Sequence, residues 1–279
     1  MLHSSINSIH HFLDSNYESE KKLPVLFIGH GSPMNGIEVN EFSTRWKNLG
    51  QEIEKPVAVI CISAHWLTRG TFVTAMDFPR TIHDFGGFPK ELYDVNYPAK
   101  GNPELAKAIP SIVTKATVEL DHDWGLDHGT WTVVRHMYPD ASIPVLQLSI
   151  DYSKPAQYHY DLAKELYSLR KKGVLIIGSG NMVHNLRMVA WDKMNEPNYG
   201  FDWAMEMNAV FKEKIISHDH QALIRYETLN KAAMLAIPTP DHYYPLIYTL
   251  ALQDEKDEIQ FFNDKAVAGS LTMTSVRIG

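Results

Sequence analysis

Short apolar runs alternate along the chain with segments whose apolar residues recur every three or four positions. Several of the runs are apolar at every position, as expected for strands that helices cover on both faces of a sheet. Strands are predicted at Pro24–Ile28, Pro56–Ser63, Thr71–Ala75, Ala116–Leu120, Ile143–Ile150 and Val174–Gly178, with two closing strands in Glu258–Phe262 and Leu271–Ile278.

The segments with helical periodicity lie between and after these strands. Helices are predicted at Glu38–Leu49, Pro103–Ile109, Thr130–Tyr138, Pro155–Lys172, Phe201–Ile216, Gln221–Leu229 and Pro240–Leu252. Proline near the start of two of them fits the first turn of a helix, where no backbone donor is needed. No repeat, low-complexity tract or linker divides the chain, so the alternation predicts one α/β domain. Residues 1–22 read as a polar leader with a short helix near Ile9–Leu13.

Composition narrows the class of protein. A chain of 279 residues with 44% hydrophobic content can bury a large core. Lys and Arg number 26 against 33 Asp and Glu, so we expect no nucleic-acid partner. The single cysteine, Cys61, lies in an apolar strand, which excludes an internal disulfide and fits a reducing cytoplasm. No apolar segment reaches the roughly 18 residues of a membrane span, and the N-terminus lacks signal-peptide features.

Three histidines follow buried apolar runs. His30 comes after VLFIG, His65 after VAVICISA and His184 after VLIIGSGNMV. The carboxyl ends of strands are where open α/β sheets build their sites, so these imidazoles are expected to converge. His30 and His65 follow consecutive strands that could be neighbours in the sheet. Imidazole suits Fe, Zn, Cu and Ni, and the pattern therefore predicts one metal centre.

Further candidates lie in loops and helix starts. His128, in DWGLDHGTW, precedes a helix and could hydrogen-bond a substrate or oxygen near the metal. His242, in PTPDHYYPL, falls in the first turn of a predicted helix, where a buried or capping histidine is the common alternative to a ligand. The long segment Met76–Lys100 is rich in Pro, Gly and aromatic residues, including His83 and Asp84, and would suit a flat aromatic ligand.

Absent motifs exclude other chemistries. The chain has no H-E-x-x-H, no C-x-x-C pair, no P-loop and no G-x-S-x-G nucleophile elbow. A dinucleotide loop fails because Val183 stands where the third glycine would be. Zincin proteases, zinc ribbons, P-loop enzymes and serine hydrolases are therefore not expected.

Six motifs together resemble one enzyme family. GHGSPMN, SAHW, TIHDFGGFP, WGLDHGTW, SGNMVHNLR and TPDHYYPL occur in order from about Leu23 to the C-terminus. They are similar to the 4,5-DOPA dioxygenase branch of the class III extradiol ring-cleavage dioxygenases, the superfamily of the protocatechuate 4,5-dioxygenase catalytic subunit. The resemblance implies a catalytic domain over 23–279, a single-domain three-layer αβα fold with a mostly parallel central sheet.

The resemblance also implies the metal site. The family's first two ligands fall on His30 and His65, and its third falls on His242, where the protocatechuate enzymes carry a glutamate. Its active-site base falls on His184, and the resemblance implies a possible role for this residue as a fourth ligand in zinc-loaded members. Three histidines in place of two histidines and a carboxylate leave one more positive charge at the site. One divalent metal per chain is implied, Fe(II) for dioxygenase activity and Zn(II) in the purified protein.

The remaining implied roles concern the substrate. His128 matches a histidine that contacts substrate or oxygen, and the loop with His83 and Asp84 would shape the substrate pocket. The implied reaction is cleavage of a catechol, L-DOPA or a related diphenol, by O2 to a muconate semialdehyde, in a monomer or small homo-oligomer. An imidazole near neutrality suits the proton transfers, so His184 is the expected base.

Two alternatives stay open on the sequence alone. The same histidines could hold zinc for a hydrolase, with Asp84, Asp127 or Asp241 as base. The chain could also be a non-catalytic binding member of the superfamily, although such members tend to lose ligand histidines and this chain keeps them.

Overall fold

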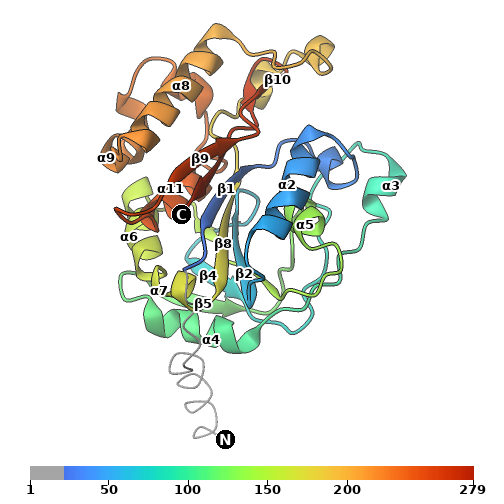
Figure 1. The fold of residues 1–279 in the computed structure, drawn as a ribbon, viewed down its shortest axis with the longest axis vertical. Coiled ribbons are helices and arrows are strands. Elements are labelled where there is room, and N and C mark those ends of the chain that lie inside the picture. Colours follow the sequence, from blue (N-terminus) through green and yellow to red (C-terminus); the bar gives the residue numbers. More distant parts are fainter. Residues whose placement is uncertain (1–21) are drawn as a thin grey trace, which may run out of the picture.

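A six-stranded sheet forms the centre of the computed structural model, which describes residues 22–279 (Figure 1). Its strands, in spatial order, are β6 (Val145–Gln147), β2 (Ala58–Ser63), β8 (Val174–Gly180), β1 (Val25–Gly29), β12 (Ser275–Ile278) and β9 (Ile259–Phe262). The pairs β6·β2, β2·β8 and β8·β1 are parallel, and β12 is antiparallel to both of its neighbours. The predicted mostly parallel sheet is confirmed.

Helices cover both faces of this sheet. Alternate strand residues enter two separate cores: Val25 and Phe27 lie in one, and Leu26 and Ile28 in the other. The core containing Leu26 packs against α2 (Glu41–Glu52) and α5 (His128–Met137). The opposite core packs against α4 (Pro103–Ile112), α6 (Ala156–Glu165), α8 (Asp202–Ile216) and α11 (Tyr244–Ala251). This is the three-layer αβα arrangement expected from the resemblance.

Shorter elements connect these layers. They are α3 (Lys90–Tyr93), α7 (Ser168–Lys171), α9 (His220–Ile224), α10 (Ala233–Ala236), β3 (Leu67–Thr68), β4 (Thr71–Thr74), β5 (Val118–Asp121), β7 (Ile150–Asp151), β10 (Ala266–Val267) and β11 (Leu271–Thr272). The six strands among them form three two-stranded sheets, β3·β7, β4·β5 and β10·β11. The predicted strand Ile143–Ile150 is therefore two strands, since β6 pairs with β2 and β7 with β3.

Two predictions are wrong, one about which strands are neighbours and one about the length of a helix. The strands before His30 and His65, β1 and β2, are separated by β8, the strand that precedes His184. The predicted helix Pro155–Lys172 is broken into α6 and α7, because the Leu166 and Tyr167 amides bond to carbonyls three residues back and tighten the turn.

A buried arginine holds the ends of several elements together. Arg170, in α7, is fully buried and bonds to the Leu23, Leu252 and Ile278 carbonyls. Its guanidinium pairs with the Asp257 carboxylate at 2.7 Å. The start of β1, the end of α11 and the end of β12 thus meet at one charged group.

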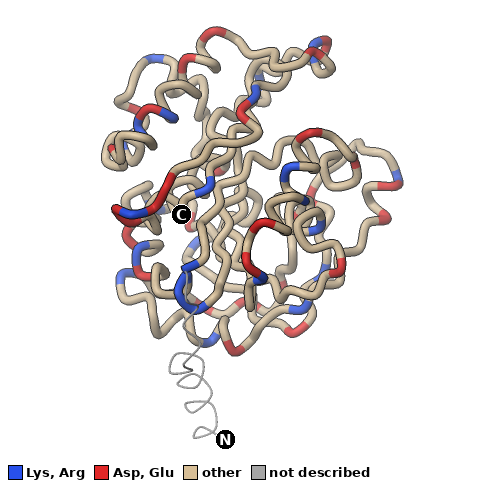
Figure 2. The backbone as a smooth tube through the Cα atoms, in the orientation of Figure 1, with Lys and Arg blue, Asp and Glu red and all other residues tan. Residues whose placement is uncertain are grey.

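The predicted polar leader falls almost wholly outside the described residues. The helix expected near Ile9–Leu13 lies there too. Lys22, its last position, is described and pairs with Asp257 at 2.7 Å. Figure 2 shows both signs of charge interspersed over the outer helices and loops. Within residues 22–279, no helix has the length and apolarity to cross a bilayer.

Candidate metal centre

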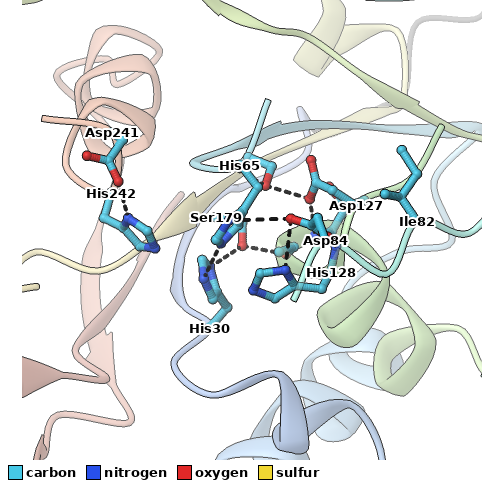
Figure 3. Close-up of polar contacts among 12 residues, drawn as sticks. His30, His65, Ile82, Asp84, Asp127, His128, Ser179, Asp241 and His242 are labelled. Carbon is cyan, nitrogen blue, oxygen red and sulfur yellow. Dashed lines mark hydrogen bonds and ion pairs between the residues drawn. The ribbon is translucent and has the colours of Figure 1, made fainter. Parts of the chain in front are cut away.

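Three imidazoles from distant parts of the chain face one another at the carboxyl end of the sheet (Figure 3). His30 directly follows β1, His65 follows β2, and His242 lies before α11. The ring centroids of His30 and His65 are 5.0 Å apart, those of His30 and His242 5.3 Å, and those of His65 and His242 5.0 Å. The three rings therefore form a nearly equilateral triangle.

His242 reaches this triangle from a turn and not from the helix predicted for it. The helix α11 begins two residues later, at Tyr244. The His242 carbonyl accepts the Asn181 amide at 3.0 Å, just beyond β8. A Cβ on Gly180 would lie 2.1 Å from that carbonyl oxygen, so the approach needs glycine.

Hydrogen bonds fix which nitrogen of His30 is free. The Ser179 hydroxyl donates to the Gly129 carbonyl at 2.5 Å, which uses its only proton. Its oxygen therefore accepts from Nδ1 of His30, 3.0 Å away. The Nε2 atom of His30 is left without a proton and lies 3.0 Å from Nε2 of His65.

In His242 and His65, too, Nδ1 faces a polar side chain. Nδ1 of His242 donates to the Asp241 carboxylate at 2.5 Å, and Nδ1 of His65 lies 3.5 Å from the Asp84 carboxylate. Each Nε2 is then a bare lone pair. Partners of this kind on the outer nitrogen are the usual support of metal-binding histidines.

Burial keeps these imidazoles uncharged. It lowers the pKa of His30 and of His242 well below the ordinary value, with the neighbouring histidines adding to the effect. Burial, followed by the nearby His128, lowers the pKa of His65 to about 3. Two bare nitrogens 3.0 Å apart with no proton between them repel, and a divalent cation would remove that repulsion. The donor set therefore fits a metal ion.

His128 stands beside the triangle as the first residue of α5. Its Nδ1 lies 3.0 Å from an Asp84 carboxylate oxygen, and its backbone amide donates to the other at 2.9 Å. The ring centroids of His128 and His65 are only 3.8 Å apart. His30, His65 and His128 have candidate ligand atoms that all lie within 4.8 Å of one another.

His184 lies on the other side, stacked on His242. Their centroids are 3.5 Å apart and their planes differ by 6°. Burial lowers the pKa of His184 to about 4, and the Asp241 charge opposes this in part. Together with Asp241, the two rings form a second group whose candidate ligand atoms lie within 4.8 Å.

All five histidines line one pocket of about 730 Å³. Its apolar walls include Phe42, Phe88, Trp191 and Met273. His83 and Asp84 are not among the lining residues. His83 instead donates to the Val95 carbonyl at 2.9 Å, and Asp84 sits behind His65 and His128.

Sequence reasoning missed the supports behind these rings. Ser179 is the link between His30 and α5, and Ser63, Asp127 and Gln147 form a buried group beside His65. A signal existed for Ser63 and Ser179: each is a small polar residue at the end of an otherwise apolar strand. No sequence motif indicated that Trp191 would line the pocket.

Residues 24–275 match the family described as the catalytic LigB subunit of aromatic ring-opening dioxygenase. The chain belongs to this family. It is thus an aromatic ring-opening dioxygenase of the extradiol type, as the sequence motifs predict.

Relatives of this LigB family member include proteins named 4,5-DOPA dioxygenase extradiol. The 4,5-DOPA dioxygenase extradiol of Escherichia coli K12 is 44% identical over 265 residues, 94% of this chain and 96% of the relative. The protein of that name from Beta vulgaris is 33% identical and covers 90% of this chain and 94% of the relative. A crystal structure of an uncharacterized protein from Escherichia coli K12 superposes with a TM-score of 0.80 at 40% identity. The match covers 92% of this chain and all of that one (100%).

Proposed function

We propose that this LigB family member cleaves a catechol ring with O2 to a muconate semialdehyde, using one non-haem divalent metal ion. L-DOPA or a related diphenol is the proposed substrate, because the two relatives are named 4,5-DOPA dioxygenase extradiol. One observation carries the proposal: three uncharged imidazoles line one pocket of the right size for an aromatic ring, each with Nδ1 facing a polar neighbour and Nε2 left free.

The proposed ligands are His30, His65 and His242. A ring bound through Nε2 at about 2.1 Å has its centroid about 3.2 Å from the ion, so tetrahedral or facial ligands have centroids about 4.5–5.3 Å apart. The measured separations of 5.0, 5.3 and 5.0 Å agree with this. We propose Fe(II) for activity, and Zn(II) as the ion that three neutral imidazoles retain on purification.

His184 fits the role of base better than that of fourth ligand. Rings stacked 3.5 Å apart, as His184 and His242 are, would subtend an angle of only about 65° at a shared ion, well below tetrahedral or octahedral angles. His184 lines the pocket, and burial lowers its pKa to about 4, so the ring is uncharged near pH 7 and can accept a catechol proton, although it is a weaker base than the near-neutral imidazole expected from the sequence.

His128 is proposed to contact the substrate hydroxyl or oxygen. Its ring is too near His65 for both to bind one ion, by the same argument from the 3.8 Å separation. The Asp84 carboxylate at Nδ1 keeps the proton there and leaves Nε2 as an acceptor. Asp84 and His83 then serve the substrate indirectly, Asp84 by orienting His128 and His65, and His83 by holding the loop at Val95.

A bound iron ion would supply the Lewis acid and the electron transfer that O2 chemistry requires. The chain supplies the rest. Phe42, Phe88 and Met273 enclose the ring in an apolar pocket, His184 accepts a hydroxyl proton and returns one as the ring opens, and His128 steadies the group opposite. We propose residues 23–279 as the catalytic unit.

The test is anaerobic loading with Fe(II), followed by addition of L-DOPA or other catechols and then air. Oxygen uptake with a yellow semialdehyde product is expected. No uptake with any catechol would contradict the proposal, and hydrolysis of esters or phosphates by the zinc form without O2 would support a zinc hydrolase instead.

A further inference from the structure

A buried carboxylate behind the site has no part in the proposed ring cleavage. Asp127 has no exposed surface, and it precedes the first residue of α5, His128. Burying a carboxylate is costly unless hydrogen bonds compensate, so its partners need to be identified.

The Asp127 partners come from three elements. One carboxylate oxygen accepts the Ser63 hydroxyl at 2.7 Å and the Thr130 amide at 3.1 Å. The other accepts the Gln147 side-chain amide at 2.6 Å, while the Gln147 carbonyl oxygen accepts the Asp127 backbone amide at 2.8 Å. Asp127 thus joins the end of β2, the start of α5 and the end of β6.

The link through Ser63 leads to a proposed ligand. The Ser63 oxygen accepts the backbone amide of His65 at 3.3 Å, so the turn after β2 is tied to the carboxylate. A Cβ on Gly129 would lie 2.5 Å from the Ser63 oxygen and 2.9 Å from a carbon of the His65 ring. The first turn of α5 therefore rests directly against the turn that carries His65.

The same helix turn is tied to the other ligand strand. The Gly129 carbonyl accepts the Ser179 hydroxyl at 2.5 Å, and Ser179 contacts Nδ1 of His30 at 3.0 Å. A displacement of this turn would move the supports of both His30 and His65.

We propose that Asp127 is a positioning residue that sets the spacing between His65, His30 and His128 by fixing the first turn of α5 against the end of β2. The proposal rests on the proposed metal centre. It predicts that changing the Asp127 hydrogen bonds alters the metal site more than an equal loss of stability elsewhere does.

The test uses Co(II) as a spectroscopic probe on the full chain. Asp127→Asn keeps the shape but replaces one accepting oxygen by an NH2 group, which then faces either the Gln147 NH2 group or the Ser63 hydroxyl and Thr130 amide. We expect Co(II) affinity to fall tenfold or more, within the range for residues supporting metal ligands, and its visible spectrum to shift. Ser63→Ala, which removes only the link to the His65 turn, should change both in the same direction.

Two further variants separate positioning from general stability. In Asp127→Asn combined with Gln147→Glu, the new carboxylate accepts the Asn amide, and we expect affinity and spectrum to recover. Asn102→Ala removes the N-cap of α4, whose side chain accepts the Leu105 amide far from the histidines in sequence. It should lower Tm and leave Co(II) binding unchanged.

The outcomes are distinct. Folded Asp127→Asn with unchanged affinity and spectrum would overturn the positioning role alone, as would an equal loss of affinity in Asn102→Ala. Failure of the unaltered chain to bind Co(II) would overturn the metal centre and this inference with it.

Discussion

Each proposed ligand turns Nδ1 towards a polar neighbour and keeps its other ring nitrogen for an ion. His30 uses Ser179, His65 uses Asp84 and His242 uses Asp241. These different roles of the two ring nitrogens explain why short polar residues recur beside the histidines. It also makes the contribution of each support measurable.

Replacing Asp241 with Ala should weaken metal binding without removing a ligand. Nδ1 of His242 would lose its 2.5 Å partner, so the ring could rotate or change tautomer. We expect Zn(II) affinity to fall roughly 10–100-fold, measured by competition with a chromophoric chelator. Asp219→Ala, which removes the N-cap of α9, is the control. Unchanged affinity in Asp241→Ala would show that the carboxylate does not orient His242.

His184→Ala should lower activity but keep the metal, whereas His242→Ala should lose the metal. We propose that His184, which stacks on His242, transfers protons and does not bind the metal, so its loss should leave one metal per chain and lower kcat by about 10²-fold or more. His242→Ala should lose the metal itself. Metal content by mass spectrometry, with oxygen uptake on the same samples, tests both. Loss of metal from His184→Ala would make His184 a ligand.

Among the elements, the positions of the central strands can be predicted from the sequence, but the order of these strands in the sheet cannot. Continuous apolar runs indicated β1, β2 and β8 because both faces of those strands are buried. Nothing local indicates that β8 lies between the other two, since strand order is set by the packing of the helices between them. In the same way, the position of His242 ahead of α11 depends on its contact with the end of β8.

His159, buried where α6 packs against α11, should make the unfolding free energy depend on pH. His159 is fully buried, 2.9 Å from the Tyr248 hydroxyl, and burial lowers its pKa to about 4, with Asp151 opposing the shift in part. As pH falls from 6.5 towards 4, the unfolded chain gains this proton first, so stability should decrease by up to about 3 kcal/mol. Above pH 6.5 this contribution is constant.

His159→Gln removes the titrating group and keeps a polar partner for Tyr248. The difference in unfolding free energy between variant and parent, from urea titrations in chelator, should become more favourable to the variant between pH 6.5 and 4. Comparing the two chains cancels the other histidines. A pH-independent difference would contradict the assignment.

At the scale of the whole molecule, Arg170 joins segments from both ends of the described chain. Arg170→Met would remove the buried guanidinium from the Asp257 carboxylate, which would keep only Lys22 and the Asp254 amide, and would take the side-chain donor from three carbonyls. We expect a loss of about 3–5 kcal/mol in unfolding free energy, from urea denaturation. Arg45→Met removes a partly exposed pair with Glu52 and should cost less than about 1 kcal/mol. Equal costs would mean that the buried arginine contributes no more than a surface pair.

The whole site shows where sequence reasoning ends. Histidines after apolar runs, together with the family motifs, indicated all five imidazoles of the pocket. The sequence could not reveal which rings converge and which stack, because those relations depend on the final packing of β1, β2, β8 and the turn at His242. It also gave no sign that Asp84 would lie behind the site and not line it.

An anomalous difference map from zinc-loaded crystals would locate the proposed metal ion. We expect one peak, at about 2.0–2.3 Å from Nε2 of His30, His65 and His242, and farther from His184. A peak held by His30, His65 and His128, or no peak among these residues, would contradict this expectation.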